Sequence, residues 1–540
     1  MKEIKWYIGL IFSLITAFLL LFSFPTYNIN IFGFFALIPI FIIVYTSTIR
    51  KTLVYGIVSG FLFYCLYLFW MNAYLAVVGV VVATLVYGGY FVITLLLINL
   101  AGRALPKYRA VLTPFIWIAI EYIRSFGFLG FTFGSIGYTQ HNFLRFIQIA
   151  DIGGEPLVSF IIVLFNAGIA HMCVLLFEKR PVIQRKELVT GALPLFVSTG
   201  LIIISLIYGS IRLNEPIPKD PFMKLSLIQA LSSPRTEWKT EKWKTLKRLI
   251  DLSKKSQNEN PDTDLIVWTE TAIRTSLRPN FIYGSAYHMR IQRLIKSLNT
   301  YFIIGSPDNY TVHKETKENQ DKLTAIYPGK NEEEIWTNSA YLLNNSGEII
   351  GKYDKIQLTP FGEHFPPGRH LPFLQKVIDK FTDSAGFTPG IEHTIFAYEK
   401  FKFGVVICWE GTYGYLIRKH VNNGADFMIN ISNDMWTQTK AGHFQHFTLT
   451  KFRAIENRIW FVRAANDGVT AFINPHGEVV KILPIKEAGY ITEEIGPKVR
   501  STFYTSYGDT LPRISLAVLA ISFIFSIFLL IKHPSRVKNR

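Results

Sequence analysis

The sequence predicts a multi-pass α-helical membrane domain that carries an α/β domain outside the cytoplasm. Three observations lead to this fold class. The chain has 540 residues, which is too long for one ordinary soluble domain. Half of its residues are hydrophobic, and long apolar segments gather before residue 212 and near the C-terminus. Between them, short apolar runs alternate with helix-compatible stretches.

Eight apolar segments predict the membrane spans. Most reach the ~20 residues that a helix needs to cross a hydrocarbon core ~30 Å thick. The fifth segment is short and contains Glu121, and the boundary between the third and fourth, near Asn72, is weak. The first lacks a small-residue cleavage site before Pro25, so we interpret it as an uncleaved anchor. The segments cover residues 5–23, 31–48, 53–72, 75–100, 109–124, 156–177, 189–211 and 512–531.

Basic residues mark alternate loops between these segments. The loops 24–30 and 71–74 contain no lysine or arginine, and 125–154 contains only Arg145. Because cytoplasmic loops are enriched in these residues, both chain ends are predicted to lie in the cytoplasm and the polar region outside it. The basic segments are residues 2–5, 50–51, 103–109, 179–186 and 532–540.

The same distribution argues against a nucleic-acid partner. The net charge is +17, but the charges lie in short clusters between apolar runs and form no basic face with an RNA- or DNA-binding motif.

The predicted domains are a membrane domain of about seven helices at 1–212, an extracytoplasmic domain at 213–511 with its core at about 220–497, a C-terminal span at 512–531 and a basic cytoplasmic tail at 532–540.

The polar region has the element order of an α/β domain around one core. Helix-compatible stretches at 237–255 and 285–298 lie between strand-like runs. Residues 341–355 predict a hairpin, because Asn345, Ser346 and Gly347 supply a turn. The strand-like runs are residues 223–230, 264–270, 301–308, 403–410 and 426–434.

Cys408 is the only cysteine of this region, since Cys65 and Cys173 lie in predicted spans. Free cysteine is among the most buried residue types, so packing at the end of a strand is one interpretation. A thiolate is stabilised where a strand gives way to a helix, and a lone thiol outside the cytoplasm is open to oxidation, so a nucleophile is the other. Position alone leaves both open.

A cysteine nucleophile usually needs a base and a group that stabilises an oxyanion. Glu270 ends the apolar run in "VWTETAI", and Lys355 and Glu363 lie in "GKYDKIQLTPFGEHFPPG". Taken singly, Glu270 also fits a helix-cap acid, Lys355 a solvated lysine and Glu363 a loop charge.

In this order, and each in its own local motif, Glu270, Lys355 and Cys408 resemble the Glu-Lys-Cys triad of the nitrilase superfamily. The segments "GADFMINISNDMW" and "RAIENRIWFVRAAN" after the cysteine are also similar to that superfamily. Eight predicted spans, together with "YDKIQLTPFGEHFP" and "EYIRSFGFLGFTFGSIGYTQ", resemble one membrane-embedded branch of it, the bacterial apolipoprotein N-acyltransferases.

The resemblance implies a nitrilase-like α-β-β-α sandwich for the polar domain and assigns roles to its residues. Glu270 would be the general base, Lys355 would stabilise the oxyanion and Cys408 would be the nucleophile. The residues expected to support this site are Glu363, Glu410 and Trp238. The candidate acyl-chain contacts, for which packing inside the domain is the alternative, are Phe361, Phe365 and Phe373.

The resemblance also implies an acyltransferase of the bacterial inner membrane with a periplasmic catalytic domain. The donor would be a phospholipid similar to phosphatidylethanolamine, and the acceptor would be the N-terminal diacylglyceryl-cysteine of an apolipoprotein. A membrane-tethered amidase with water as acceptor, or a catalytically silent scaffold, are the alternatives. No cofactor is expected, and no metal is expected at His443 and His446, because no matching ligand cluster accompanies them.

Overall fold

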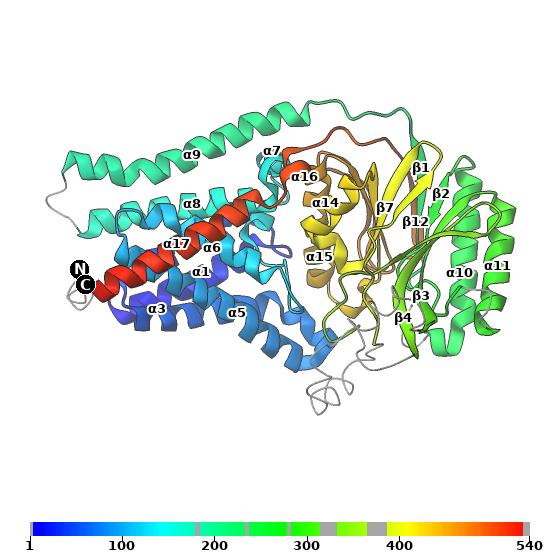
Figure 1. Cartoon of the computed structure of the whole chain (residues 1–540), viewed down its shortest axis with the longest axis horizontal. Coiled ribbons are helices and arrows are strands. Elements are labelled where there is room, and N and C mark those ends of the chain that lie inside the picture. Colours follow the sequence, from blue (N-terminus) through cyan, green and yellow to red (C-terminus); the bar gives the residue numbers. More distant parts are fainter. Residues whose placement is uncertain are drawn as a thin grey trace. The chain divides into compact units, whose positions relative to one another are not determined.

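The computed structural model describes residues 4–178, 184–232, 237–277, 282–313, 332–363 and 386–532. The contacts within the chain divide it into two compact units. The helical unit comprises residues 1–216, 439–456 and 502–540, and the sandwich unit comprises residues 217–438 and 457–501. Figure 1 shows helices in the first unit and two sheets with flanking helices in the second.

Six helices of the described residues are long and apolar enough to cross a membrane. The second and fifth predicted spans are shorter, an apolar stretch at Asn30–Thr46 and the 16-residue helix α6. The helices of this unit are α1 (Trp6–Ser23), α2 (Ile38–Thr46), α3 (Ile49–Gly56), α4 (Leu62–Tyr67), α5 (Asn72–Ala104), α6 (Arg109–Arg124), α7 (Leu144–Ile147), α8 (Ala150–Glu178), α9 (Arg185–Leu213), α15 (Lys440–Asn457), α16 (Phe503–Tyr507) and α17 (Thr510–Lys532).

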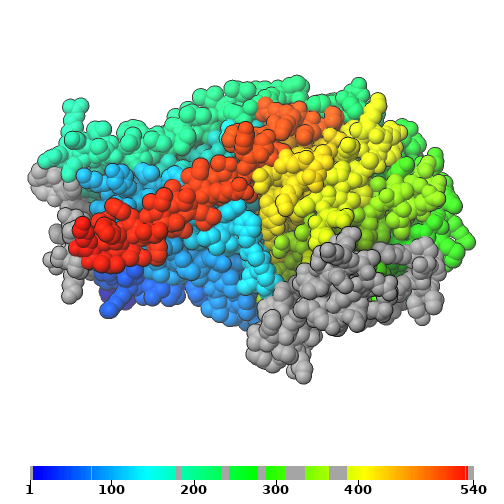
Figure 2. Space-filling model, in the orientation of Figure 1, coloured from blue at the N-terminus to red at the C-terminus, as the bar shows by residue number. Residues whose placement is uncertain are grey.

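The outer surface of the helical unit is apolar where its long helices face outward. Helix α17, orange to red in Figure 2, packs against α5 and α6. On its outward side Ile521, Ile524 and Phe528 are 69%, 68% and 53% exposed. A helix that presents large apolar side chains to the outside suits a lipid environment, so this surface fits a membrane domain.

A glycine sets the direction of α8. Gly154 has φ +68° and interrupts the helix two residues before Pro156. A Cβ atom at Gly154 would lie 2.6 Å from the ring of Tyr504 on α16, so only glycine fits both the backbone and the contact. The long apolar part of α8 therefore begins beside the predicted start of the sixth span.

Helix α15 groups with the helical unit, although the predicted boundaries assign its residues to the polar domain. Trp70 Nε1 donates a hydrogen bond of 2.8 Å to Gln445 Oε1. Lys451 Nζ donates a bond of 2.9 Å to the carbonyl of His141. The polar sequence of α15 gives no sign of these partners, which come from residues more than 300 positions earlier.

The sandwich unit contains two six-stranded sheets, in the orders β12-β1-β2-β3-β4-β5 and β11-β10-β9-β8-β7-β6. The centres, β1-β2-β3 and β7-β8-β9, are parallel, and the outer strands pair antiparallel. Its elements are β1 (Met223–Gln229), α10 (Glu237–Glu259), β2 (Leu265–Val267), α11 (Ile282–Leu298), β3 (Tyr301–His313), β4 (Glu332–Leu343), β5 (Ile349–Asp354), β6 (Ile395–Tyr398), β7 (Phe401–Ile407), α14 (Gly414–Asn422), β8 (Phe427–Ser432), β9 (Trp460–Ala465), β10 (Thr470–Ile473), β11 (Val479–Leu483) and β12 (Gly489–Ile495).

The two sheets pack face to face through one apolar core. Successive strand residues point to opposite faces, so Leu265 and Val267 of β2 join the core between the sheets, together with Val405 of β7. Ile266 points the other way, into a second core formed with α10 and α11. Helix α14 packs against β7 of the other sheet. This layering is the predicted α-β-β-α sandwich.

Candidate active site

Three strand ends of the sandwich unit carry the residues singled out by the sequence. Lys355 directly follows β5, Cys408 directly follows β7 and Glu270 lies three residues beyond β2. All three side chains are buried. Their strands lie in the packed core, which fixes the backbone positions from which the side chains project.

Lys355 lies between two carboxylates. Its Nζ is 3.5 Å from Glu270 Oε1 and 2.9 Å from Glu363 Oε2. The Lys355 residue is only 1% exposed, so the ammonium is held away from water by the protein. Removing a cation from water is costly unless it is paired, and two carboxylates meet that need here.

Asn338 on β4 joins the two carboxylates, and sequence reasoning missed it. Its Nδ2 donates hydrogen bonds of 2.8 Å to Glu270 Oε1 and 2.7 Å to Glu363 Oε1. The backbone N–H of Asn433 donates a bond of 2.8 Å to the other oxygen of Glu270. Both oxygens of Glu270 are thus held by donors, which fixes the orientation of this carboxylate.

Cys408 occupies a strained turn. It is the first residue of the 3₁₀ turn Cys408–Thr412, it has φ +58°, and it is 4% exposed. Its carbonyl accepts a hydrogen bond of 2.9 Å from Asn430 Nδ2. A left-handed backbone is unusual for any residue other than glycine, and such strain clusters at functional sites.

Glu410 holds this turn against the loop after β5. Its carboxylate accepts bonds of 2.7 and 2.8 Å from the N–H groups of Ile356 and Gln357, and one of 2.8 Å from that of Ile407. The Tyr353 hydroxyl lies 3.0 Å from both of its oxygens. Glu410 therefore connects the backbone beside Lys355 with the backbone beside Cys408.

Comparison with known proteins agrees with this architecture. The carbon-nitrogen hydrolase model matches residues 224–504, and the apolipoprotein N-acyltransferase N-terminal domain model matches residues 16–168. Apolipoprotein N-acyltransferase 2 of Treponema denticola is 31% identical over 82% of this chain and 81% of its own. The apolipoprotein N-acyltransferase of Geobacter metallireducens is 29% identical over 92% of this chain and 91% of its own. The chain belongs to the apolipoprotein N-acyltransferase family.

The two matched regions of this family member correspond to different parts of the structure. The N-terminal match lies within the helical unit, and the carbon-nitrogen hydrolase match covers the sandwich strands. The apolar helices and the family together make the chain a membrane protein. The side of the membrane on which each terminus lies stays a prediction.

The pKa values of the two carboxyl groups of the site, Glu270 and Glu363, shift in opposite directions. Burial raises the pKa of Glu270 above its ordinary value, against the lowering effect of Lys355. Burial also opposes ionisation of Glu363, but Lys355 and the N–H of Thr359 bring its pKa below the ordinary value. Glu270 therefore resembles a proton acceptor with an adjusted pKa, and Glu363 resembles a fixed anion.

The pKa values of the Cys408 thiol and the Lys355 ammonium are both raised, which leaves the thiol neutral and the lysine charged. Burial raises the pKa of the Cys408 thiol, the charge of Glu270 raises it further, and Lys355 lowers it. Burial would lower the pKa of Lys355, but Glu363 and Glu270 raise it above its ordinary value. At neutral pH the thiol is protonated and the lysine is charged, so a reaction at sulfur needs a base.

The structure places the remaining predicted residues as follows. Trp238 lies near the start of α10, but its side chain is outside the described residues. Phe361 follows the Lys355 loop with φ +64°, whereas Phe365 and Phe373 fall outside the described residues. Among the described positions, no cluster of three or more His, Cys, Asp or Glu side chains is arranged to hold a metal.

Proposed function

We propose that this protein transfers the sn-1 acyl chain of a phospholipid to the α-amino group of the N-terminal diacylglyceryl-cysteine of apolipoproteins, through a thioester on Cys408. One observation carries the proposal. A buried carboxylate and a buried ammonium lie 3.5 Å apart, and both act on the charge state of a cysteine on a strained turn. Family membership supplies the substrate class, since the relatives are named for apolipoprotein N-acylation.

The first half-reaction forms the thioester. Glu270 takes the proton of the Cys408 thiol as the sulfur attacks the ester carbonyl of the lipid. The carbonyl oxygen gains negative charge, which the Lys355 ammonium stabilises. The carbon–oxygen bond then breaks, and the departing alkoxide takes the proton from Glu270. A lysophospholipid leaves, and the acyl chain remains on sulfur.

The second half-reaction uses the same groups in a ping-pong sequence. The amine of the apolipoprotein attacks the thioester carbonyl and passes a proton to Glu270. Lys355 again stabilises the oxyanion. The carbon–sulfur bond breaks, the Cys408 thiolate recovers the proton from Glu270, and an amide is released. Glu363, Asn338 and Glu410 exchange no proton in either half-reaction and position Glu270, Lys355 and the Cys408 turn.

A membrane-embedded enzyme suits these substrates. Each buried CH₂ of an acyl chain contributes about 0.8 kcal/mol to membrane affinity, so neither a phospholipid nor a diacylglyceryl protein readily leaves the bilayer. The proposed donor resembles phosphatidylethanolamine. Phe361, Phe365 and Phe373 are proposed to contact the acyl chain, and the active site is proposed to face the periplasm, with both termini in the cytoplasm.

The test is intact mass spectrometry of the detergent-purified protein after incubation with phosphatidylethanolamine. We expect an acyl-sized mass increase that Cys408→Ala abolishes and that a diacylglyceryl-peptide amine discharges. Cys173→Ala is the matched control, because it removes a free cysteine of the helical unit and should keep the adduct.

Two results would overturn the proposal. An adduct of unchanged yield in Cys408→Ala would show that Cys408 is not the nucleophile. No adduct from several phospholipids, together with turnover of a simple amide, would instead establish a membrane-tethered amidase with water as the acceptor.

A further inference from the structure

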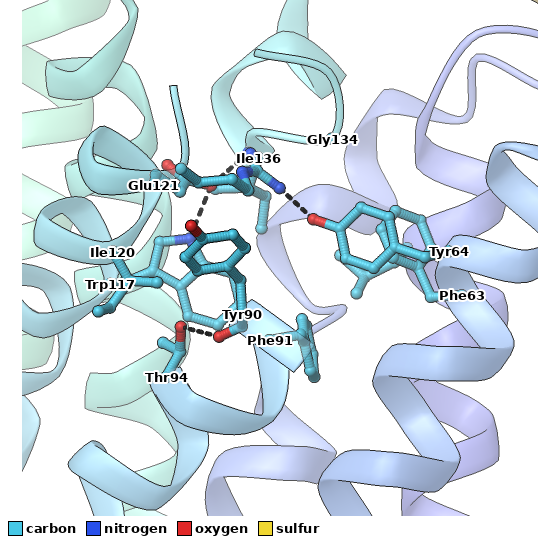
Figure 3. Close-up of a pocket in the computed structure, with 12 residues that line it drawn as sticks. Phe63, Tyr64, Tyr90, Phe91, Thr94, Trp117, Ile120, Glu121, Gly134 and Ile136 are labelled. Carbon is cyan, nitrogen blue, oxygen red and sulfur yellow. Dashed lines mark hydrogen bonds between the residues drawn. The ribbon is translucent and has the colours of Figure 1, made fainter. Parts of the chain in front are cut away.

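A pocket inside the helical unit combines aromatic walls with two charged side chains (Figure 3). It is lined by side chains from α1, α4, α5 and α6, and by the loop that follows α6. Phe63, Phe91 and Trp117 supply ring surfaces, whereas Glu121 and Arg124 supply the charges. Ionisable residues inside a membrane bundle are costly, so such residues mark functional sites.

Arg124 is a buried cation that the protein leaves without an ion pair. It is 4% exposed, and its Nη atoms bond to the Tyr64 hydroxyl and, at 3.0 Å, to Ser135 Oγ. No carboxylate of the described residues makes a salt bridge with it, and its Nε, also buried, has no hydrogen-bond partner among them. The guanidinium thus retains an unused Nε–H donor and has no carboxylate of the described residues within salt-bridge distance, although Glu121 lies in the same pocket.

Only one carboxylate oxygen of Glu121, which lies one helical turn before Arg124, accepts hydrogen bonds from the described residues. Its Oε1 accepts bonds of 2.8 Å from Trp117 Nε1 and 3.1 Å from the N–H of Ile136. Its Oε2 is buried without a partner among the described atoms. The nearby Ser159 hydroxyl donates to Glu155 at 2.5 Å. One pocket therefore offers a guanidinium Nε–H and a carboxylate oxygen that have no hydrogen-bond partner among the described atoms.

The position of the pocket along α6 suits a lipid headgroup. Helix α6 has 16 residues and so is about 24 Å long. If the basic turn between α5 and α6 lies at one membrane surface, Arg124 comes close to the far side of a hydrocarbon core ~30 Å thick. Headgroups lie at that level, and acyl chains extend from it along apolar helix surfaces.

We propose that this pocket binds the headgroup of a zwitterionic phospholipid, with the phosphate on Arg124 and the amine on Glu121. Arginine is suited to phosphate because its planar donors match the oxygens. A carboxylate beside it selects a headgroup that also carries a cation. The pocket residues belong to the helical unit and Cys408 to the sandwich unit, and binding here does not require that the lipid be the acyl donor.

The test measures lipid binding without turnover. Full-length Cys408→Ala protein in detergent is given equal amounts of phosphatidylethanolamine and phosphatidylglycerol, and retained lipid is read by native mass spectrometry. We expect preferential retention of phosphatidylethanolamine. Arg124→Gln should reduce retention of both lipids about tenfold. Glu121→Gln should remove the preference while keeping phosphatidylglycerol bound.

Two controls separate recognition from loss of structure. Tyr64→Phe removes a partner of Arg124 but keeps its charge, so the lipid ratio should hold. Arg212→Gln removes an arginine of the same unit that is already paired with Glu215 and Asp151, and should not change retention. If Arg124→Gln is too unstable to purify, the ratio in Glu121→Gln still decides.

Three results would overturn the inference. These are unchanged retention in Arg124→Gln, an equal loss in Arg212→Gln, or an unchanged lipid ratio in Glu121→Gln. Because binding is read in a protein without the proposed nucleophile, these failures are distinct from a failure of the acyl-transfer proposal, which the adduct experiment measures separately.

Discussion

Two buried cations in this molecule are held in opposite ways. Lys355 in the sandwich unit has two carboxylates within 3.5 Å of its ammonium. Arg124 in the helical unit bonds only to the neutral hydroxyls of Tyr64 and Ser135. Both residues are less than 5% exposed, so solvent accounts for neither arrangement.

The difference indicates that the protein itself supplies the counter-charges of Lys355, whereas a bound ligand supplies an anionic partner for Arg124. A buried cation with two anions has its desolvation offset by the protein, and its position is fixed before any substrate arrives. A buried cation that bonds only to neutral hydroxyls has no anion within salt-bridge distance, so an anionic group can still pair with it on binding. The predictions below test that distinction.

The largest effect is expected for Lys355→Met, which leaves two carboxylates buried without their cation. Breaking a buried pair by removing one partner costs roughly 3–5 kcal/mol of unfolding free energy. Loss of an oxyanion donor lowers the rate by about 10²–10³-fold. Thermal unfolding and the rate of thioester formation from phosphatidylethanolamine measure the two effects.

Lys352→Met is the matched control. Lys352 lies three residues earlier, bonds to Asp308 at 2.9 Å and Asp354 at 3.0 Å, and is partly exposed. Because Asp308 is buried, some stability should be lost, but activity should persist, since the partners Asp308 and Asp354 lie outside the active site. Equal losses in the two variants would mean that Lys355 has a merely structural role.

An intermediate effect is expected in the pH dependence of thioester formation. Glu270 acts as a base only when ionised, so activity is present above its pKa and falls as the pH drops through it. Because burial raises that pKa, the acid limb should lie above about pH 4.5, the ordinary carboxyl range.

Glu363→Gln should move this limb to lower pH. The negative charge of Glu363 contributes to the raised pKa of Glu270, so its removal lets Glu270 ionise more easily. The profile of kcat/KM against pH measures the shift. A limb that stays in place, or moves to higher pH, would contradict the assignment of Glu270 as the base.

The sequence predicted the parts of the site that lie in local motifs at strand ends. Glu270 and Cys408 lie toward the ends of predicted strand-like runs, and Lys355 ends the predicted hairpin. The structure has strands there, β2, β7 and β5, each of which ends before the site residue. Asn338 could not be predicted, because an asparagine within β4 has no distinguishing pattern. Its role depends on pairing with β5, where its carbonyl accepts a bond from the N–H of Lys355.

Long-range contacts also limited the prediction of the helical unit. The polar sequence of α15 is typical of a soluble domain, and only its bonds to residues such as Trp70 and His141 reveal its unit. Glu121 drew attention only because a charge weakens a predicted span. Helical spacing brings Glu121 and Arg124 to neighbouring turns of α6, but the loop that folds back over them and donates from the N–H of Ile136 to Glu121 is not encoded by periodicity.

The smallest effect is expected for Tyr64→Phe, which alters the surroundings of Arg124 without altering its charge. Loss of one hydrogen bond to a charged group costs about 1.5–3 kcal/mol, and Ser135 still accepts from the same guanidinium, so we expect the lower end of that range. Thermal unfolding should detect this loss in lipid-free detergent. Added phosphatidylethanolamine should restore part of it, because a bound phosphate can accept the bond that Tyr64 vacates. Lys352→Met should show no such restoration, because the carboxylates that lose their partner, Asp308 and Asp354, do not bind a phosphate. If added lipid stabilised Tyr64→Phe and Lys352→Met equally, the response would not depend on Arg124, and the inferred phosphate site would be contradicted.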